Sequence, residues 1–311
     1  MRSIAFLGAL AALALLAACS TAPKGYDVFE ARNAAAGDMK IGDGLMDRGD
    51  WGGAVEAYTR ALRADSGIDY LEGIARSHAS LGKAYLAAGE VDAAEKEFLD
   101  ALDYGRLAAS GPALSLASGG LGEVAWARGD KEGAAARFAE ALDQAGKDEG
   151  ALALALHQGA RAKAGSGLGA EAKADLLKAA GLNEKAGRLV QAASNRYLLA
   201  SILVAEGELE GALSQALLAL AADKRVENGP GIAQDLGALG AISLRLGRKA
   251  EAWDYWRRSF DSSLAANLPR QVAKALAALR ALGKDVGKEA EARHYGELLA
   301  RLEALEGGAL P

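Results

Sequence analysis

Small and apolar residues recur along the chain at intervals of about forty residues. Each copy has a Gly and an Ala five residues later. In most copies a large apolar residue follows four positions after that Ala, and another small residue three positions further on; the fifth copy has Ala216 in the large position, and the last copy is weaker. The Ala positions, spaced by 40, 40, 38, 40, 40 and 40 residues, are Ala54, Ala94, Ala134, Ala172, Ala212, Ala252 and Ala292. A fixed period of this length is typical of repeat proteins, so we expect about seven structural repeats.

Composition identifies the elements of each repeat as helices. Ala supplies 74 of the 311 residues and Gly 39, whereas only 5% of the residues are aromatic. Ala is the strongest helix former, and the scarcity of aromatic and clustered β-branched residues excludes an all-β fold. Upstream of the repeated Gly, each copy but the last has a Leu–Gly pair or a variant of it, such as Leu81–Gly82. The pattern predicts an all-α chain, an α-solenoid of about seven antiparallel helix pairs.

Proline and glycine mark the expected helix ends. Pro112, Pro230 and Pro269 lie 18, 18 and 17 residues after the preceding Ala position, where the first helix of the next pair should begin. Pro is tolerated there because the first helical N–H has no partner within the helix. In several turns an acidic residue follows the Gly, which suits a C-cap followed by an N-cap or first turn. The clearest examples are Gly49–Asp50, Gly89–Glu90, Gly129–Asp130 and Gly207–Glu208.

The fourth copy, about residues 148–182, differs from the others. It follows the 38-residue spacing, has Leu176 in the aromatic position and contains the Gly-rich turn Gly165–Gly169. Two interpretations stay open, a change of curvature at this point or ordinary drift of the repeat. The last helix, about residues 288–306, mixes Leu with Arg and Glu and resembles a capping helix with one polar face.

Charge and cysteine content narrow the classes of partner. The formal net charge is −5, which argues against nucleic acid as a main partner because that affinity depends on neutralising phosphates. One Cys permits no internal disulfide and no zinc site of four Cys or of two Cys and two His. The three His residues are 79 and 137 residues apart in the sequence. We therefore expect no metal and no cofactor.

The N-terminus has the features of an export signal. A positively charged Met1–Ser3 precedes an apolar run of 13 residues, Ile4–Leu16, which is too short for a membrane-spanning helix. The following Leu16–Cys19 segment, with two Ala before the only Cys, resembles the lipidation signal of bacterial lipoproteins. The resemblance implies that Cys19 is lipidated and becomes the new N-terminus, and several acyl chains give a stable anchor. A secretory signal in which Cys19 is incidental is the alternative.

These features divide the chain into four parts. We expect a signal peptide at 1–18, the lipidated Cys and tether at 19–25, the repeat domain at 26–306 and a tail at 307–311. Ser20 after the Cys implies, by the same resemblance, an outer-membrane location facing the periplasm, with retention at the inner membrane as the alternative.

The repeat itself resembles the tetratricopeptide repeat, and the second copy fits best, with Leu81, Gly82, Tyr85 and Phe98 in the family's positions. The resemblance implies a right-handed superhelix in which the first helix of each pair lines a concave face. The period exceeds the common one of about 34 residues, which leaves the pitch and the groove positions open. The groove candidates implied by the resemblance are Met39, Asp43, Arg76, Lys83, Glu123, Trp126, His157, Arg161, Tyr197 and Ser201.

Trp126 and Tyr197 are the most informative candidates, because large aromatic residues with a polar group often anchor partners. Packing against the next repeat explains them equally well. No motif indicates catalysis: the Gly165–Ala170 segment follows no strand and lacks the Gly-Lys-Ser/Thr ending of a P-loop. We therefore predict a protein that is not an enzyme.

Two functions remain. The first is a membrane-anchored scaffold that binds a peptide or helix of a partner in cell-wall, outer-membrane, or secretion and pilus assembly machinery. The second is an accessory lipoprotein of a periplasmic solute transport system, which binds a solute-binding protein or a small apolar ligand. The sequence identifies neither the partner nor the oligomeric state.

Overall fold

The computed structural model describes residues 28–307, and within them every regular element is helical. The lipidation site Cys19, the signal peptide 1–18, the tether 19–25 and most of the predicted tail lie outside these residues. Fourteen α-helices and one short 3₁₀ helix follow one another: α2 (Val28–Arg48), α3 (Trp51–Ser66), α4 (Leu71–Ala88), α5 (Val91–Leu107), α6 (Gly111–Ala127), α7 (Lys131–Ala145), α8 (Glu149–Gly165), α9 (Gly169–Lys185), α10 (Leu189–Glu206), α11 (Leu209–Arg225), α12 (Gly229–Arg245), α13 (Lys249–Ala265), α14 (Pro269–Leu282), η1 (Gly283–Val286) and α15 (Glu289–Gly307).

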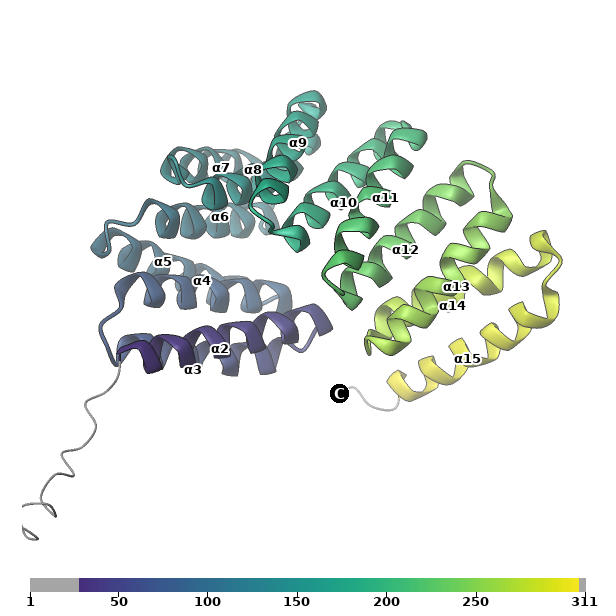
Figure 1. The fold of residues 1–311 in the computed structure, drawn as a ribbon, viewed down its shortest axis with the longest axis horizontal. Helices are drawn as coiled ribbons and strands as arrows, with labels where there is room; N and C mark the ends of the chain where they lie inside the picture. Colours follow the sequence, from purple (N-terminus) through teal and green to yellow (C-terminus); the bar gives the residue numbers. More distant parts are fainter. Residues whose placement is uncertain (1–27, 308–311) are drawn as a thin grey trace, which may run out of the picture.

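Consecutive helices pack as seven antiparallel pairs, from α2–α3 as pair one to α14–α15 as pair seven. The predicted α-solenoid is therefore confirmed. Pairs stack in sequence order into a curved array (Figure 1). Inside every pair the turn contains the repeated Gly in the left-handed region, with φ between +69° and +85° at Gly49, Gly89, Gly129, Gly167, Gly207, Gly247 and Gly287. Only Gly adopts this conformation without steric cost, which explains the period of the Gly residues.

The predicted helix starts are confirmed for proline and for the acidic residues. Pro112, Pro230 and Pro269 all occupy the first turn of α6, α12 and α14. The carboxylates of Asp50 and Asp130 accept N-cap hydrogen bonds from Gly53 N and Gly133 N, at 3.0 and 2.8 Å. The Glu residues in the same positions, Glu90 and Glu208, make no such bond. Glu90 and Glu208 therefore lie at the predicted N-cap position, but the longer Glu side chain, unlike Asp, does not cap the helix.

The small residue of each Leu–Gly pair lies against the large residue of the second helix. A Cβ added at Gly82 would lie 2.9 Å from the Phe98 ring, and one at Gly240 would lie 2.8 Å from the Trp256 ring. Gly42 meets Tyr58 and Gly122 meets Phe138 in the same way. The absence of a side chain lets the helices cross closely over an aromatic ring. Pairs four and five instead combine Ala160 with Leu176 and Ala200 with Ala216.

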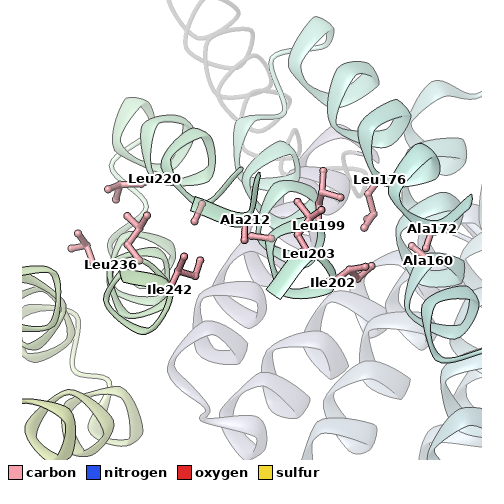
Figure 2. Close-up of a cluster of buried hydrophobic side chains, with 13 residues drawn as sticks. Ala160, Ala172, Leu176, Leu199, Ile202, Leu203, Ala212, Leu220, Leu236 and Ile242 are labelled. Carbon is pink, nitrogen blue, oxygen red and sulfur yellow. The ribbon is translucent and has the colours of Figure 1, made fainter. Parts of the chain in front are cut away.

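Pairs four to six share one apolar core (Figure 2). Leu176, Leu199, Leu203 and Leu239 are buried in it, and Ala216 lies among them where other pairs have a ring. Leu and Ile from the first helices thus replace the volume of the missing aromatic residue. The repeated Ala positions are fully buried in six copies and 6% exposed at Ala292.

The array curls until its first pair meets its last. In Figure 1 the tip of α2–α3 lies beside the start of α14. The guanidinium carbon of Arg270, in α14, lies 5.0 Å from the ring centroid of Trp51, in α3. This cation–π contact joins two residues that are more than two hundred positions apart in the sequence. The concave face is therefore enclosed by the two ends of the solenoid. Among the described helices none is both long enough and apolar enough to cross a bilayer.

Candidate binding groove

Three neighbouring cavities lie along the concave face, and Tyr197 of α10 lines all of them. We name them by one residue each: the Trp126 cavity of about 180 Å³, the Asp235 cavity of about 200 Å³ and the Trp256 cavity of about 300 Å³. Ser194, one turn before Tyr197, is shared by the first two. The three cavities are thus parts of one groove.

The Trp126 cavity contains half of the residues predicted for the groove. Its lining includes Glu123, Trp126, His157, Arg161 and Tyr197, from α6, α8 and α10. The Arg161 guanidinium carbon lies 6.0 Å from the ring centroid of Trp126. The first helices of three consecutive pairs therefore bring these five side chains together around one cavity.

His157 is held by a buried chain of hydrogen bonds. Its Nδ1 lies 3.0 Å from Asn195 Nδ2, whose amide oxygen accepts a bond of 2.9 Å from Asn183 Nδ2. Arg188 Nε in turn donates to Asn183 Oδ1 at 2.7 Å. Because an amide nitrogen only donates, His157 Nδ1 accepts and the ring is neutral. Burial and the cations of Arg161 and Lys83 lower the His157 pKa to about 4.

Packing accounts for part of the surface of Trp126 and Tyr197, and their role as anchors for a partner stays a prediction. Trp126 packs on Phe138 and Ala162, while Tyr197 packs on the cluster that contains Ala193. Each is only partly buried and also lines a cavity. Packing fixes their orientation, and each side chain also faces a cavity.

The other predicted residues lie outside the three cavities. Met39 packs beside the core of pair one, and Asp43 accepts a hydrogen bond of 2.8 Å from the Tyr58 hydroxyl. Arg76 is exposed, and Lys83 is partly buried close enough to His157 to lower its pKa. Ser201 is exposed and donates to the backbone oxygen of Tyr197 at 3.1 Å.

The Asp235 cavity contains residues that the sequence did not single out. Asp223 at the end of α11 and Asp235 in α12 are 3% and 2% exposed, and they are hydrogen-bonded to each other. Burial, followed by the charge and hydrogen bond of Asp223, raises the Asp235 pKa to about 8. Burial also raises the pKa of Asp223, which Asp47 of α2 raises further. The signal in the sequence was an Asp at positions that hold small residues such as Gly105 and Ala117 in another repeat.

The Trp256 cavity has a basic lining. Arg270 and Lys274 of α14 contribute their side chains, and Lys274 Nζ lies 5.9 Å from the ring centroid of Trp256. Gln234 and Gln271 line this cavity and the Asp235 cavity. Along the groove, therefore, a cavity with Arg161 is followed by an acidic one and then by a basic one.

Two further features lie outside the groove. His78 Nδ1 is 2.8 Å from Glu97 Oε2, and possible ligand atoms of His78, Glu97 and Asp100 all lie within 4.8 Å of one another. Carboxylates three residues apart on one helix were visible in the sequence, but their pairing with His78 depends on the packing of α4 on α5. Separately, an apolar cavity of about 250 Å³ lies at the fourth copy, between residues that include Phe138, Leu156 and Leu168.

Comparison with known proteins agrees with this architecture. The tetratricopeptide repeat family model matches residues 39–112 and 80–149, which include pairs two and three. No curated protein sequence matches the chain.

Solved structures extend the likeness beyond this segment. BtubC (BKLC) from P. vanneervenii has a TM-score of 0.61 at 18% identity, covering 72% of this chain and 92% of its own. PilF of Pseudomonas aeruginosa has a TM-score of 0.54 at 17% identity, covering 76% of this chain and 93% of its own. A Rap protein complexed with Competence and Sporulation Factor has a TM-score of 0.59 at 16% identity, covering 85% of this chain and 72% of its own. The chain thus has the fold of a tetratricopeptide-like solenoid, a class that generally serves protein interaction and not catalysis.

Proposed function

We propose that this protein is a non-catalytic scaffold of the bacterial cell envelope. It is anchored through lipid-modified Cys19 and binds its partner in the concave groove. The groove binds a peptide or helix of a partner protein in cell-wall, outer-membrane, or secretion and pilus assembly machinery. The observation that carries this proposal is the row of three cavities around Tyr197, which offers aromatic surface and charges of both signs.

The site favours binding over catalysis for a chemical reason. His157, the titratable ring in the groove, accepts a hydrogen bond at Nδ1 and has a pKa of about 4. It is therefore a poor general base at neutral pH. The Rap protein of similar fold is complexed with Competence and Sporulation Factor, which supports the binding of another molecule as a use of this fold.

Photo-crosslinking tests the groove directly. A photoreactive amino acid at Ser194, which is exposed between two cavities, should give a crosslinked adduct with an envelope protein in intact cells. The same residue at Leu217, which is 43% exposed on the second helix of the same pair, is the control and should give none. Adducts of equal yield at both positions, or none at Ser194, would contradict a groove-bound partner.

The anchor is tested separately. Cys19→Ala should abolish incorporation of labelled palmitate and move the protein from the membrane fraction to the soluble fraction. Outer- and inner-membrane fractions separated by density then decide between the two predicted membranes. Palmitate incorporation that persists in Cys19→Ala would exclude Cys19 as the lipidated residue.

A second function is favoured by the apolar cavity at the fourth copy. Its volume of about 250 Å³ and its apolar lining suit a small apolar ligand, as expected for an accessory protein of solute transport. Native mass spectrometry of the protein purified from its host should reveal a co-purified small molecule in that case. A mass equal to that of the lipidated chain alone would leave the scaffold as the better proposal.

A further inference from the structure

The Asp235 cavity is built by helices from both ends of the solenoid. Asp47 comes from α2, Asp223 from the end of α11, Asp235 from α12 and Gln271 from α14. The closure of the array therefore creates this cavity, since Asp47 reaches it from the first pair. Three carboxyl groups line a volume of about 200 Å³.

None of these carboxyl groups forms an ion pair with a described residue, although the cation of Arg48 acts on Asp47 electrostatically. The ion pairs formed among residues 28–307 include neither Asp47 nor Asp223 nor Asp235. Asn228 Nδ2 donates to Asp223 Oδ1 at 3.0 Å. Apart from the contact with Asp223, Asp235 Oδ2 has no hydrogen-bond partner, although the residue is 98% buried. A buried acceptor without a donor costs free energy, which a ligand with N–H groups would recover.

Packing does not require acidic residues at this position. One repeat earlier, the equivalent residues are Asn183 and Asn195, whose amides hydrogen-bond each other at 2.9 Å. Two repeats earlier again, the same positions hold Gly105 and Ala117. A neutral pair thus fits the same crossing of helices, and the two carboxyl groups are particular to the cavity.

Geometry favours an organic cation over a metal ion. Among the described residues, the side chains whose ligand atoms lie within 4.8 Å of one another are His78, Glu97 and Asp100, and the three carboxylates of this cavity form no such group. The cavity also presents the Tyr197 side chain and the amide of Gln234. An aromatic ring beside spaced acceptors suits a cation that carries several N–H donors.

We infer that the Asp235 cavity binds an ammonium or guanidinium group, supplied by a Lys or Arg side chain of the segment that occupies the groove. This assignment of the source rests on the proposed function. The cation lies between Asp47 and the Asp223–Asp235 pair, and the rest of the segment continues along Tyr197 into the Trp126 cavity, where Arg161 can pair with an acidic residue. The cavity thus selects the register of a bound peptide.

Binding of defined probes to the full-length chain in detergent micelles tests the inference. The probes are acetyl-Ala-Arg-Ala-amide and its citrulline analogue, which keeps the shape and removes the charge. Ligand-observed NMR should give at least a tenfold weaker affinity for the citrulline peptide. Asp235→Asn and Asp223→Asn should each lower the affinity for the Arg peptide at least tenfold. Equal affinities for the two peptides, or unchanged affinity in both variants, would overturn the inference.

Asp65→Asn is the matched control. Asp65 occupies the equivalent position of pair one and is 1% exposed, but it lines none of the three cavities. Its substitution should leave the affinity for the Arg peptide unchanged, and an equal loss there would overturn the inference by showing a nonspecific effect. Circular dichroism of Asp235→Asn should remain that of the folded chain, so that lost binding cannot be due to unfolding.

Two further titrations define the ligand. Spermidine that binds at least tenfold more tightly than the Arg peptide would overturn the assignment to a partner side chain and favour a free polyamine. Saturable Ca²⁺ binding that Asp235→Asn abolishes would overturn the choice of an organic cation. Failure of the crosslink at Ser194 with retained discrimination between Arg and citrulline would refute the proposed scaffold while leaving the cation site.

Discussion

Pairs two and three differ from pairs four and five at the helix crossing inside each pair. In the former, Gly82 and Gly122 lie against the rings of Phe98 and Phe138. Pair four has Ala160 against Leu176, and pair five has Ala at both positions. In pair five, Leu and Ile of the first helices fill the space that a ring fills in pairs two and three, so the crossing requires a filled volume and no particular residue.

The junctions between successive pairs differ in the same sense. The buried positions that join pair two to three are Gly105 and Ala117, whereas those that join pair five to six are Asp223 and Asp235. Small residues there allow close packing at little cost, and carboxyl groups require compensation. The junction between pairs two and three thus consists of small, closely packed residues, while the junction between pairs five and six contributes polar surface to the groove.

Phe98→Ala would remove the ring that supports the first of these regions. Phe98 is fully buried between Gly82 of α4 and Gly120 of α6, neither of which has a side chain to fill the space. We expect a loss of about 3–5 kcal/mol in the free energy of unfolding, the range for a large cavity in a core. Urea denaturation followed by circular dichroism measures it, and hydrogen exchange should show the opening of α4–α6 first.

Leu99→Ala is the control on the same helix. Leu99 is 45% exposed, so its truncation should change stability by no more than about 0.5 kcal/mol. A loss of similar size in both variants would mean that the fit between ring and glycines is not what stabilises pair two.

Asp235→Asn should make the polar region more like the Asn183–Asn195 junction and should stabilise the protein at high pH. An unfolded Asp titrates near about 3.9. The folded pKa of Asp235 is raised to about 8, by burial first and then by Asp223. Between these values the folded chain keeps a proton that the unfolded chain has released, so stability falls as pH rises from about 4 to about 8.

The Asn variant lacks this loss. We expect it to be more stable than the native chain by about 2 kcal/mol at pH 8. This is less than the whole pKa shift would give at ~1.4 kcal/mol per pH unit, because the Asn amide must also be buried. The difference should vanish near pH 4. The other titratable groups around this cavity, Asp47, Asp223 and Tyr197, are present in both proteins. A constant difference between pH 4 and pH 9 would mean that Asp235 ionises as an ordinary Asp.

The fold could be predicted from the sequence because Gly and Pro residues mark the helix ends in each repeat. The seven Gly residues in the turns within the pairs, and each of Pro112, Pro230 and Pro269, lie where the period places them. These residues act through local backbone geometry, which a single sequence contains. The caps show the limit, because Asp50 forms one and Glu90 does not, although both are acidic residues after a Gly.

The groove could be predicted only in part. Glu123, Trp126, His157, Arg161 and Tyr197 meet because they are separated by about one repeat, and a period places them on one face. The Asp235 cavity depends instead on the curvature summed over seven pairs. This curvature brings Asp47 of the first pair to the cavity and places Arg270 of the last pair against Trp51 of the first. A small change of angle in each repeat moves that contact by a large distance, so no local pattern contains it.

Gly82→Ala with Phe98→Leu would rebuild the crossing of pair four inside pair two. Gly82→Ala alone should cost about 1.5 kcal/mol, because its Cβ would lie 2.9 Å from the Phe98 ring and this contact outweighs the better helix propensity of Ala. The smaller Leu relieves the contact, so the double variant should be more stable than the sum of the single effects by about 1 kcal/mol. Urea denaturation of all four proteins gives this coupling, and additivity would show that the two positions are independent.

The turns between successive pairs differ in which residue adopts a positive φ. The turns that follow pairs three and four use Gly146 and Gly187 at positive φ, whereas Ala109 follows pair two with φ of +48°. A residue with a Cβ is strained there, and Ala109→Gly should stabilise the protein by about 0.5 kcal/mol, since relief of strain exceeds the greater backbone entropy of unfolded Gly. The neighbouring Ala108 has a right-handed backbone with φ of −74°. Ala108→Gly should therefore destabilise by about as much, and the opposite signs at two adjacent alanines isolate backbone conformation from every other effect of removing a methyl group.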